Sequence, residues 1–142
     1  MASGFEGLEV YQQARKLRQR ISKLTKLLPE KEKRCLIPQM QRASLSVTNN
    51  IAEGHGSRSY KHTISYLYRS RGSVNELLDD IGACEDEGYF KPEHLEDLRD
   101  HAKTVLRLLN GYITHLRKRL KDTETAKHAE QGKARRTLPS SD

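Results

Sequence analysis

The chain has 142 residues, of which 35% are hydrophobic and 32% charged, and its formal net charge is +7. This length suits one domain, and because no apolar run approaches the ~20 residues of a membrane span and no secretory signal opens the chain, we expect a cytoplasmic protein. The two cysteines, Cys35 and Cys84, are far apart and form no CxxC motif, which argues against a disulfide framework or a zinc site. The positive charge favours polyanionic partners such as nucleic acid, or an acidic protein surface.

The first predicted helix covers residues 8–28, where apolar residues recur at alternating steps of three and four. These are Val10, Ala14, Leu17, Ile21, Leu24 and Leu28. The positions between them are rich in Lys and Arg, including Arg15 and Arg18, so the solvent face of this helix is a basic strip. Pro29 is expected to end it.

The second predicted helix has Pro38 in its first turn, where a missing N–H costs little. Its apolar face consists of Leu36, Met40, Ala43, Val47 and Ile51. Gly54 and Gly56 follow, and we expect them to close the helix in the left-handed conformation.

The third predicted helix begins near Ser59, a suitable N-cap, and ends at Gly88. Its apolar face consists of Ile64, Leu67, Val74, Leu78 and Ile81, with Arg71 in one heptad position. Gly72 lies in the middle of this helix, which suggests that another helix backbone passes close by.

The fourth predicted helix opens at Pro92 and has the longest apolar stripe: Leu95, Leu98, Ala102, Val105, Leu109, Tyr112, Leu116 and Leu120. From Lys121 onward the periodicity disappears. Short connections between four such helices predict an all-α fold, an antiparallel up-down-up-down four-helix bundle formed by residues 1–121. We expect residues 122–142 to form a flexible, disordered C-terminal tail.

The charge is segregated along the last two helices. Residues 75–100 hold ten acidic and two basic residues, and residues 101–121 hold six basic and no acidic residues. Antiparallel packing therefore predicts an acidic end and a basic end. The residues expected to contact nucleic-acid phosphates are Arg15, Arg18, Arg58, Lys61, Arg117, Lys118 and Arg119. Alternatively, these charges are solvated faces. In either case, an acidic end and a basic end on one molecule also suit self-association, because the two ends can pair between copies and close a ring.

The stretch from Gln41 to Gly54 resembles the QxRRAxxSIxxNIAEG signature of the bacterial four helix bundle protein family. The opening FEGLEVYQQARKL resembles the FxxLxVWxxAxxL opening of that family. Tyr66, Leu67, Gly72, Ser73, Val74, Glu76 and Leu77 resemble its third-helix motif. Three motifs in the right order make the match specific over roughly residues 4 to 120.

The resemblance implies a fold and a class of function. Members of the family were first noticed inside intervening sequences of large-subunit ribosomal RNA genes. A related branch is the accessory variability protein of diversity-generating retroelements, a basic homopentamer that binds a reverse transcriptase and its template RNA. Neither branch is known as an enzyme. This sequence departs from the pattern at Pro38 and at Arg69, which we expect at a subunit interface or on the basic surface.

Asn50 and Glu53 share a face of the second helix, and Glu76 of the third helix is a candidate to lie opposite them. We expect Asn50, Glu53, Gly54 and Glu76 to be a structural polar signature that fixes helix register. Paired carboxylates could instead serve acid/base chemistry or a metal, but no Glu-x-x-His motif accompanies them. The Arg-x4–6-His motif of small helical RNases is absent too, so neither catalysis nor a cofactor is expected.

Two functions remain. The first is a non-catalytic RNA-binding accessory protein that binds an RNA or DNA backbone and forms a homo-oligomeric ring, a pentamer by the family resemblance, with a reverse transcriptase as partner. The second is a purely structural protein–protein interaction module whose charged ends serve ring assembly without nucleic acid.

Overall fold

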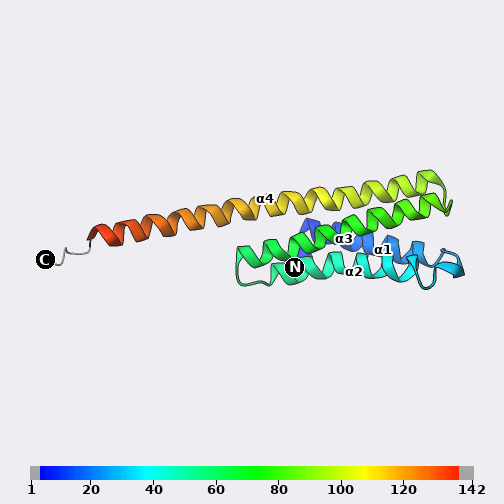
Figure 1. Ribbon diagram of the computed structural model, residues 1–142, viewed down its shortest axis with the longest axis horizontal. Helices are drawn as coiled ribbons and strands as arrows, with labels where there is room; N and C mark the ends of the chain where they lie inside the picture. Colours follow the sequence, from blue (N-terminus) through cyan, green and yellow to red (C-terminus); the bar gives the residue numbers. More distant parts are fainter. Residues whose placement is uncertain (1–3, 138–142) are drawn as a thin grey trace.

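The computed structural model describes residues 4–137 of the chain. These residues form four α-helices, α1 (Glu9–Thr25), α2 (Leu36–His55), α3 (Tyr60–Asp86) and α4 (Pro92–Thr137). Two 3₁₀ turns, Phe5–Gly7 and Glu30–Glu32, precede α1 and α2. No strand occurs in the described range, and the predicted all-α four-helix fold is confirmed (Figure 1).

Side-chain contacts between the helices show that each packed pair is antiparallel. In every pair, the residue number rises along one helix as it falls along the other. The contacts are Arg18–Thr48 and Thr25–Gln41 for α1 and α2, Val47–Ser70 and Gly54–Thr63 for α2 and α3, Tyr60–Arg119 and Arg71–Asn110 for α3 and α4, and Gln13–His101 and Arg20–Asp97 for α1 and α4. The chain therefore runs up and down through a closed bundle.

The core consists of the apolar stripes of all four helices. Every predicted stripe residue of α2 is buried, and in α1 only Leu24 is half-buried. In α3, Leu77 is buried and Leu78 is half-buried, and in α4 Ile113 is buried and Tyr112 half-buried. These one-residue shifts reflect the 3.6-residue helical period, which a strict heptad reading only approximates.

The ends of α3 follow the sequence expectation. The Ser59 Oγ accepts a hydrogen bond from the backbone N–H of His62 at 3.2 Å, so Ser59 is the N-cap. Gly88 has a φ of +69°. The Gly88 N–H donates to the carbonyl of Glu85, and the Tyr89 N–H donates to the carbonyl of Cys84. This is the Schellman arrangement that ends a helix at a left-handed glycine.

Two predictions about other glycines are wrong. Gly54 lies inside α2 and Gly56 has a φ of −82°, so neither uses the left-handed conformation. A Cβ at Gly54 would lie 3.0 Å from the Tyr66 Cβ and 3.3 Å from the Thr63 carbonyl oxygen, so close packing of α2 on α3 requires glycine there. Gly72 has no such neighbour within 4 Å, and no helix backbone approaches it.

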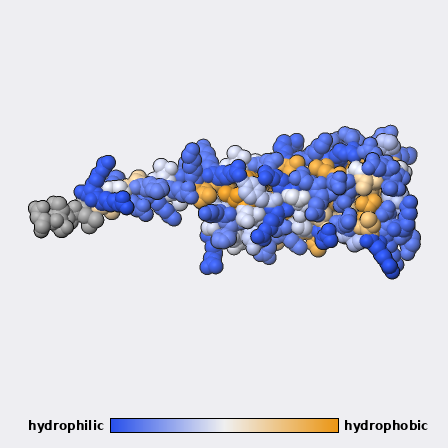
Figure 2. Space-filling view, viewed as in Figure 1, coloured by the Kyte–Doolittle hydropathy of each residue, from blue (hydrophilic) through white to orange (hydrophobic). Residues whose placement is uncertain are grey.

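The predicted disordered tail is wrong for residues 122–137, because α4 continues through them as a helix (Figure 1). Residues 138–142 lie outside the described range. The side chains of residues 121–136 are all exposed, and Figure 2 shows a mainly hydrophilic surface there. The loss of apolar periodicity after residue 120 thus marks where α4 stops packing against the bundle, and the helix itself continues. Ala, Lys, Glu and Arg favour helix, and extending a formed helix requires no new nucleus.

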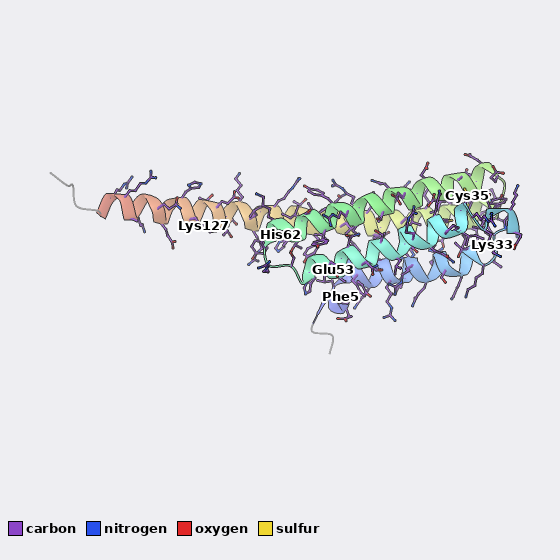
Figure 3. All side chains as sticks on the ribbon, turned by 60° about the horizontal axis from the view of Figure 1, so that its bottom comes forward. Phe5, Lys33, Cys35, Glu53, His62 and Lys127 are labelled. Atoms are coloured by element: carbon purple, nitrogen blue, oxygen red, sulfur yellow. The ribbon has the colours of Figure 1, made fainter. Side chains whose placement is uncertain are left out.

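The two ends of the bundle differ in what they present (Figure 3). Lys33 and Cys35 lie at one end, whereas Phe5, Glu53 and His62 lie at the other, and Lys127 lies on α4 beyond that second end.

Cys84 is buried in the core and Cys35 is exposed. Among the described helices, none is both long enough and apolar enough to span a membrane.

Candidate nucleic-acid interface

The end of the bundle that carries the α2–α3 connection also carries the middle of α4. Arg58 lies in the connection and Lys61 in the first turn of α3, and both are exposed. Lys118 and Arg119 are exposed on the adjacent part of α4. We call these four residues the basic end.

A groove at the basic end, which we call the Tyr60 groove, lies between Tyr60 of α3 and the middle of α4. Tyr60, Lys118 and Arg119 line this groove together with His115, Asp122 and Thr123. The Arg119 Nε donates a 3.3 Å hydrogen bond to the Tyr60 hydroxyl, and the Arg119 guanidinium carbon lies 5.9 Å from the centre of the Tyr60 ring. Two residues predicted to contact phosphates, Lys118 and Arg119 of α4, thus lie in the same groove as an aromatic side chain of α3.

A second groove lies on the other side of the first turns of α3. Its lining consists of Glu53, Gly56, Ser57, Arg58, His62 and Tyr66. The exposed Arg69 places its guanidinium carbon 5.0 Å from the centre of the Tyr66 ring. Arg69, which departs from the family pattern, therefore borders the surface that includes Arg58.

Arg117 occupies a different face of α4 from Lys118 and Arg119, because successive helical residues are rotated by about 100°. Its guanidinium carbon lies 5.2 Å from the centre of the Tyr68 ring, and that of Arg71 lies 4.7 Å from the same ring. Arg71 also donates to the Asn110 side-chain oxygen at 3.2 Å. The Tyr68 hydroxyl is buried and has no hydrogen-bond partner among residues 4–137. This cluster fastens α3 to α4.

Arg15 and Arg18 are not part of either groove at the basic end. Arg18 is half-buried and donates a 2.7 Å hydrogen bond to the Thr48 hydroxyl of α2. It lines a separate groove along α1 and α2 with Lys23, Lys26 and Gln41. Arg15 is exposed one turn earlier on α1. Arg18 thus takes part in helix packing and is only partly accessible to solvent.

A hydrogen-bond network that includes Asn50 and Gly54 of the polar signature lies along the contact between α2 and α3. The Asn50 amide donates to the backbone carbonyl and the hydroxyl of Ser46, at 2.9 and 3.0 Å. The Ser46 hydroxyl lies 2.8 Å from the Ser73 hydroxyl. Ser70 and Thr63 donate to the backbone carbonyls of Val47 and Gly54, each at 2.8 Å, which fixes the register of the two helices.

Glu53 and Glu76 are not part of that network. Glu53 is exposed in the groove that contains Arg58. Glu76 does not lie opposite Asn50, because the register that pairs Val47 with Ser70 places it beside Arg42. The expectation that one cluster contains all four signature residues is therefore wrong.

Glu76 belongs to an acidic groove with Gln39, Arg42, Asp79 and Asp80. Burial of Asp80 raises its pKa from 3.8 to about 6, with further contributions from Asp79 and Glu76 that Arg42 opposes. Arg42 leaves this groove only partly neutralised. Within residues 4–137, no three His, Cys, Asp or Glu side chains are grouped closely enough to hold a metal ion.

Tyr60 and His115 were missed as candidate interface residues. Tyr60 stands between Arg58 and Lys61 in the SRSYK stretch, and an aromatic residue flanked by basic residues is a signal for nucleic-acid binding. No comparable signal marked His115, since only the packing of α3 on α4 brings it into the Tyr60 groove.

Comparison with known proteins places the chain in a family. A crystal structure of a protein of unknown function from the S23 ribosomal protein family of Bacteroides thetaiotaomicron has the same fold, with a TM-score of 0.69 and 23% identity over 74% of this chain and 95% of that one. No curated protein sequence matches the chain. The sequence model of the 23S rRNA-intervening sequence proteins matches residues 6–111, which include the polar signature and Tyr60. The chain belongs to the 23S rRNA-intervening sequence protein family.

Proposed function

We propose that this protein is a non-catalytic RNA-binding accessory protein that binds the RNA backbone through its basic end. The observation that carries the proposal is the convergence of Arg58 and Lys61 with Lys118 and Arg119 at one end of the bundle. Phosphate binding by clustered Lys and Arg releases counterions, which gives favourable free energy without reading sequence.

The opposite end of the bundle carries acidic residues alongside basic ones. Glu85 and Glu96 both accept hydrogen bonds from Arg99, and Glu87 lies 4.0 Å from Lys31. Asp79, Asp80 and Glu76 add further negative charge. RNA is therefore expected to bind with a defined polarity relative to the bundle axis.

The test is RNA affinity of paired charge-reversal variants, measured by fluorescence anisotropy with a labelled RNA. Lys118→Glu/Arg119→Glu should weaken binding by an order of magnitude or more, because two phosphate contacts become repulsive. The matched control is Lys33→Glu/Arg34→Glu, which changes the net charge equally at the other end. Equal losses in both variants would mean that only net charge matters and would contradict a binding end.

The proposal includes self-association into a ring, with a pentamer as the size that the family resemblance implies. Support comes from the charge segregation, because an acidic and a basic end can form a heterologous contact between copies. Light scattering tests this. A mass that is a multiple of the monomer at low salt is expected, and a monomer at every concentration would contradict it.

A reverse transcriptase is the proposed protein partner, on the strength of the resemblance to accessory variability proteins. Gene context tests this part. A reverse-transcriptase gene and a repeated template beside this gene would support it, whereas a surrounding ribosomal RNA gene would point to the intervening-sequence branch.

The second candidate function is a structural interaction module without RNA, which the same charge segregation favours. Under this alternative, Lys118→Glu/Arg119→Glu changes the oligomer mass and no RNA binding occurs in the unmodified protein. The anisotropy and light-scattering measurements together separate the two functions.

A further inference from the structure

We propose that the Tyr60 groove holds an unpaired RNA base stacked on the Tyr60 ring, so that the protein prefers single-stranded to double-stranded RNA. This inference rests on the proposed function and adds the class of RNA and the residue that selects it.

The first observation is the exposure of Tyr60. Its relative exposure is 36%, whereas the other five tyrosines of the chain are half-buried. Tyr11 packs edge-on against Phe5, and Tyr68 lies against the guanidinium groups of Arg71 and Arg117. Tyr60 is thus the tyrosine ring that solvent reaches most freely.

The second observation is that the Tyr60 ring is held in place. The hydrogen bond from Arg119 Nε reaches its hydroxyl, and the guanidinium carbon lies 5.9 Å from the ring centre. A fixed aromatic ring loses less conformational entropy when a base stacks on it than a mobile ring loses. The Arg119 guanidinium plane also offers a second surface for stacking or a cation–π contact.

The third observation is the distribution of charge around the ring. Lys118 and Arg119 line the groove from α4, and Lys61 follows Tyr60 in α3. Asp122 is the acidic residue among the groove-lining side chains, one turn beyond Lys118 on α4. The groove lining thus has two basic residues against one acidic residue, which favours a phosphate next to a base on Tyr60.

These features distinguish single strands from duplexes. In a duplex, each base is stacked between its neighbours and cannot reach an aromatic side chain, whereas an unpaired base can. Every base has a π-face, so stacking on Tyr60 does not require a particular RNA sequence. The basic end alone would bind both forms, and Tyr60 adds affinity for the unpaired form only.

The experiment compares Tyr60→Ala, Tyr60→Phe and the control Leu27→Ala, using a short unstructured RNA and the same RNA annealed to its complement. Leu27 is an exposed apolar residue near the opposite end of the bundle, with 74% relative exposure. Tyr60→Ala should lose about fivefold or more in affinity for the single strand, with duplex affinity unchanged. Tyr60→Phe keeps the ring but loses the hydrogen bond from Arg119, so it should lose much less single-strand affinity than Tyr60→Ala. Leu27→Ala should match the unmodified protein.

Tyrosine fluorescence provides a second measurement that does not need the alanine variant to fold. Stacking of a base on Tyr60 should quench part of the fluorescence when single-stranded RNA is added, and Tyr60→Phe should lack that part. Unchanged single-strand affinity in Tyr60→Ala, or equal losses for both RNA forms, would overturn the stacking site while leaving the proposed function standing. Failure of the unmodified protein to bind either RNA would instead overturn the proposed function.

Discussion

Thr63 Oγ1 donates a 2.8 Å hydrogen bond to the carbonyl oxygen of Gly54, where the last turn of α2 packs on the first turns of α3. Gly54 is buried, and its missing side chain allows this approach. The NIAEG end of the family signature therefore serves helix packing in this chain. This relationship leads directly to a stability prediction.

Gly54→Ala should destabilise the bundle by roughly 1–3 kcal/mol, although alanine is the better helix former. The new Cβ would meet the Tyr66 Cβ at 3.0 Å and the Thr63 carbonyl oxygen at 3.3 Å, and a backbone atom cannot easily move away. The matched control is Gly72→Ala, which adds a methyl group in open space and should stabilise by about 0.5–1 kcal/mol. Urea unfolding measures both values, and equal effects of the two substitutions would refute a packing role for Gly54.

Asp80→Asn should stabilise the protein at neutral pH by about 1–3 kcal/mol. Because burial raises the Asp80 pKa to about 6, the folded chain holds this proton more tightly than the unfolded chain. The stability cost of the carboxylate therefore grows as the pH rises from 3.8 to about 6 and is fully present above that pH, and it disappears as the pH falls below the unfolded value of 3.8. The difference in melting temperature between variant and unmodified protein should be largest at pH 7 and vanish near pH 4. A difference that is independent of pH would contradict it.

His101 should make the bundle less stable as the pH falls below its ordinary pKa of 6.5. Burial is the largest cause that lowers the His101 pKa, and a hydrogen bond to Gln13 acts against it. Arg20 donates to His101 Nδ1 at 3.1 Å, so the neutral ring carries its proton on Nε2 and donates to the Gln13 carbonyl at 3.1 Å. The unfolded chain binds a proton near pH 6.5 before the folded chain does, so stability is present above that pH and is lost below it.

His101→Gln tests this prediction, because glutamine keeps hydrogen-bonding groups and does not titrate. The decrease in melting temperature between pH 7 and pH 5 should be smaller in His101→Gln than in the unmodified protein. An unchanged decrease would show that other groups control stability in this range. Since Asp80 acts in the opposite direction, the comparison is best made in the Asp80→Asn background.

A chain that ends at Lys121 should keep the stability of the bundle. All described side chains from 121 to 136 are exposed, so their loss should change the melting temperature by no more than about 2 °C. The far-UV circular dichroism of the full chain minus that of the shortened chain should be helical, because α4 continues to Thr137. A difference spectrum typical of disordered chain would contradict the helix and support the flexible tail expected from the composition.

Sequence patterns predicted the features that depend on neighbours along the chain. Apolar periodicity identified the buried face of each helix, and Ser59 and Gly88 marked helix ends because capping is local. The role of Gly54 was not predictable in this way. A glycine is needed either where φ is positive or where another helix packs closely, and only the position of the partner helix shows which reason applies. The position of Glu76 depends on the α2–α3 register, and the Tyr60 groove depends on how far α4 extends past α3.

The most direct test of the central claim is the salt dependence of RNA binding by the full chain. If Arg58, Lys61, Lys118 and Arg119 contact phosphates, the logarithm of the association constant should fall linearly with the logarithm of salt concentration, with a slope near −0.7 for each contact to a single strand. In Lys118→Glu/Arg119→Glu the slope should become less negative by about 1.4 or more, because two phosphate contacts are lost. In Lys33→Glu/Arg34→Glu the slope should stay unchanged. A slope near zero, or no binding at low salt, would contradict the account.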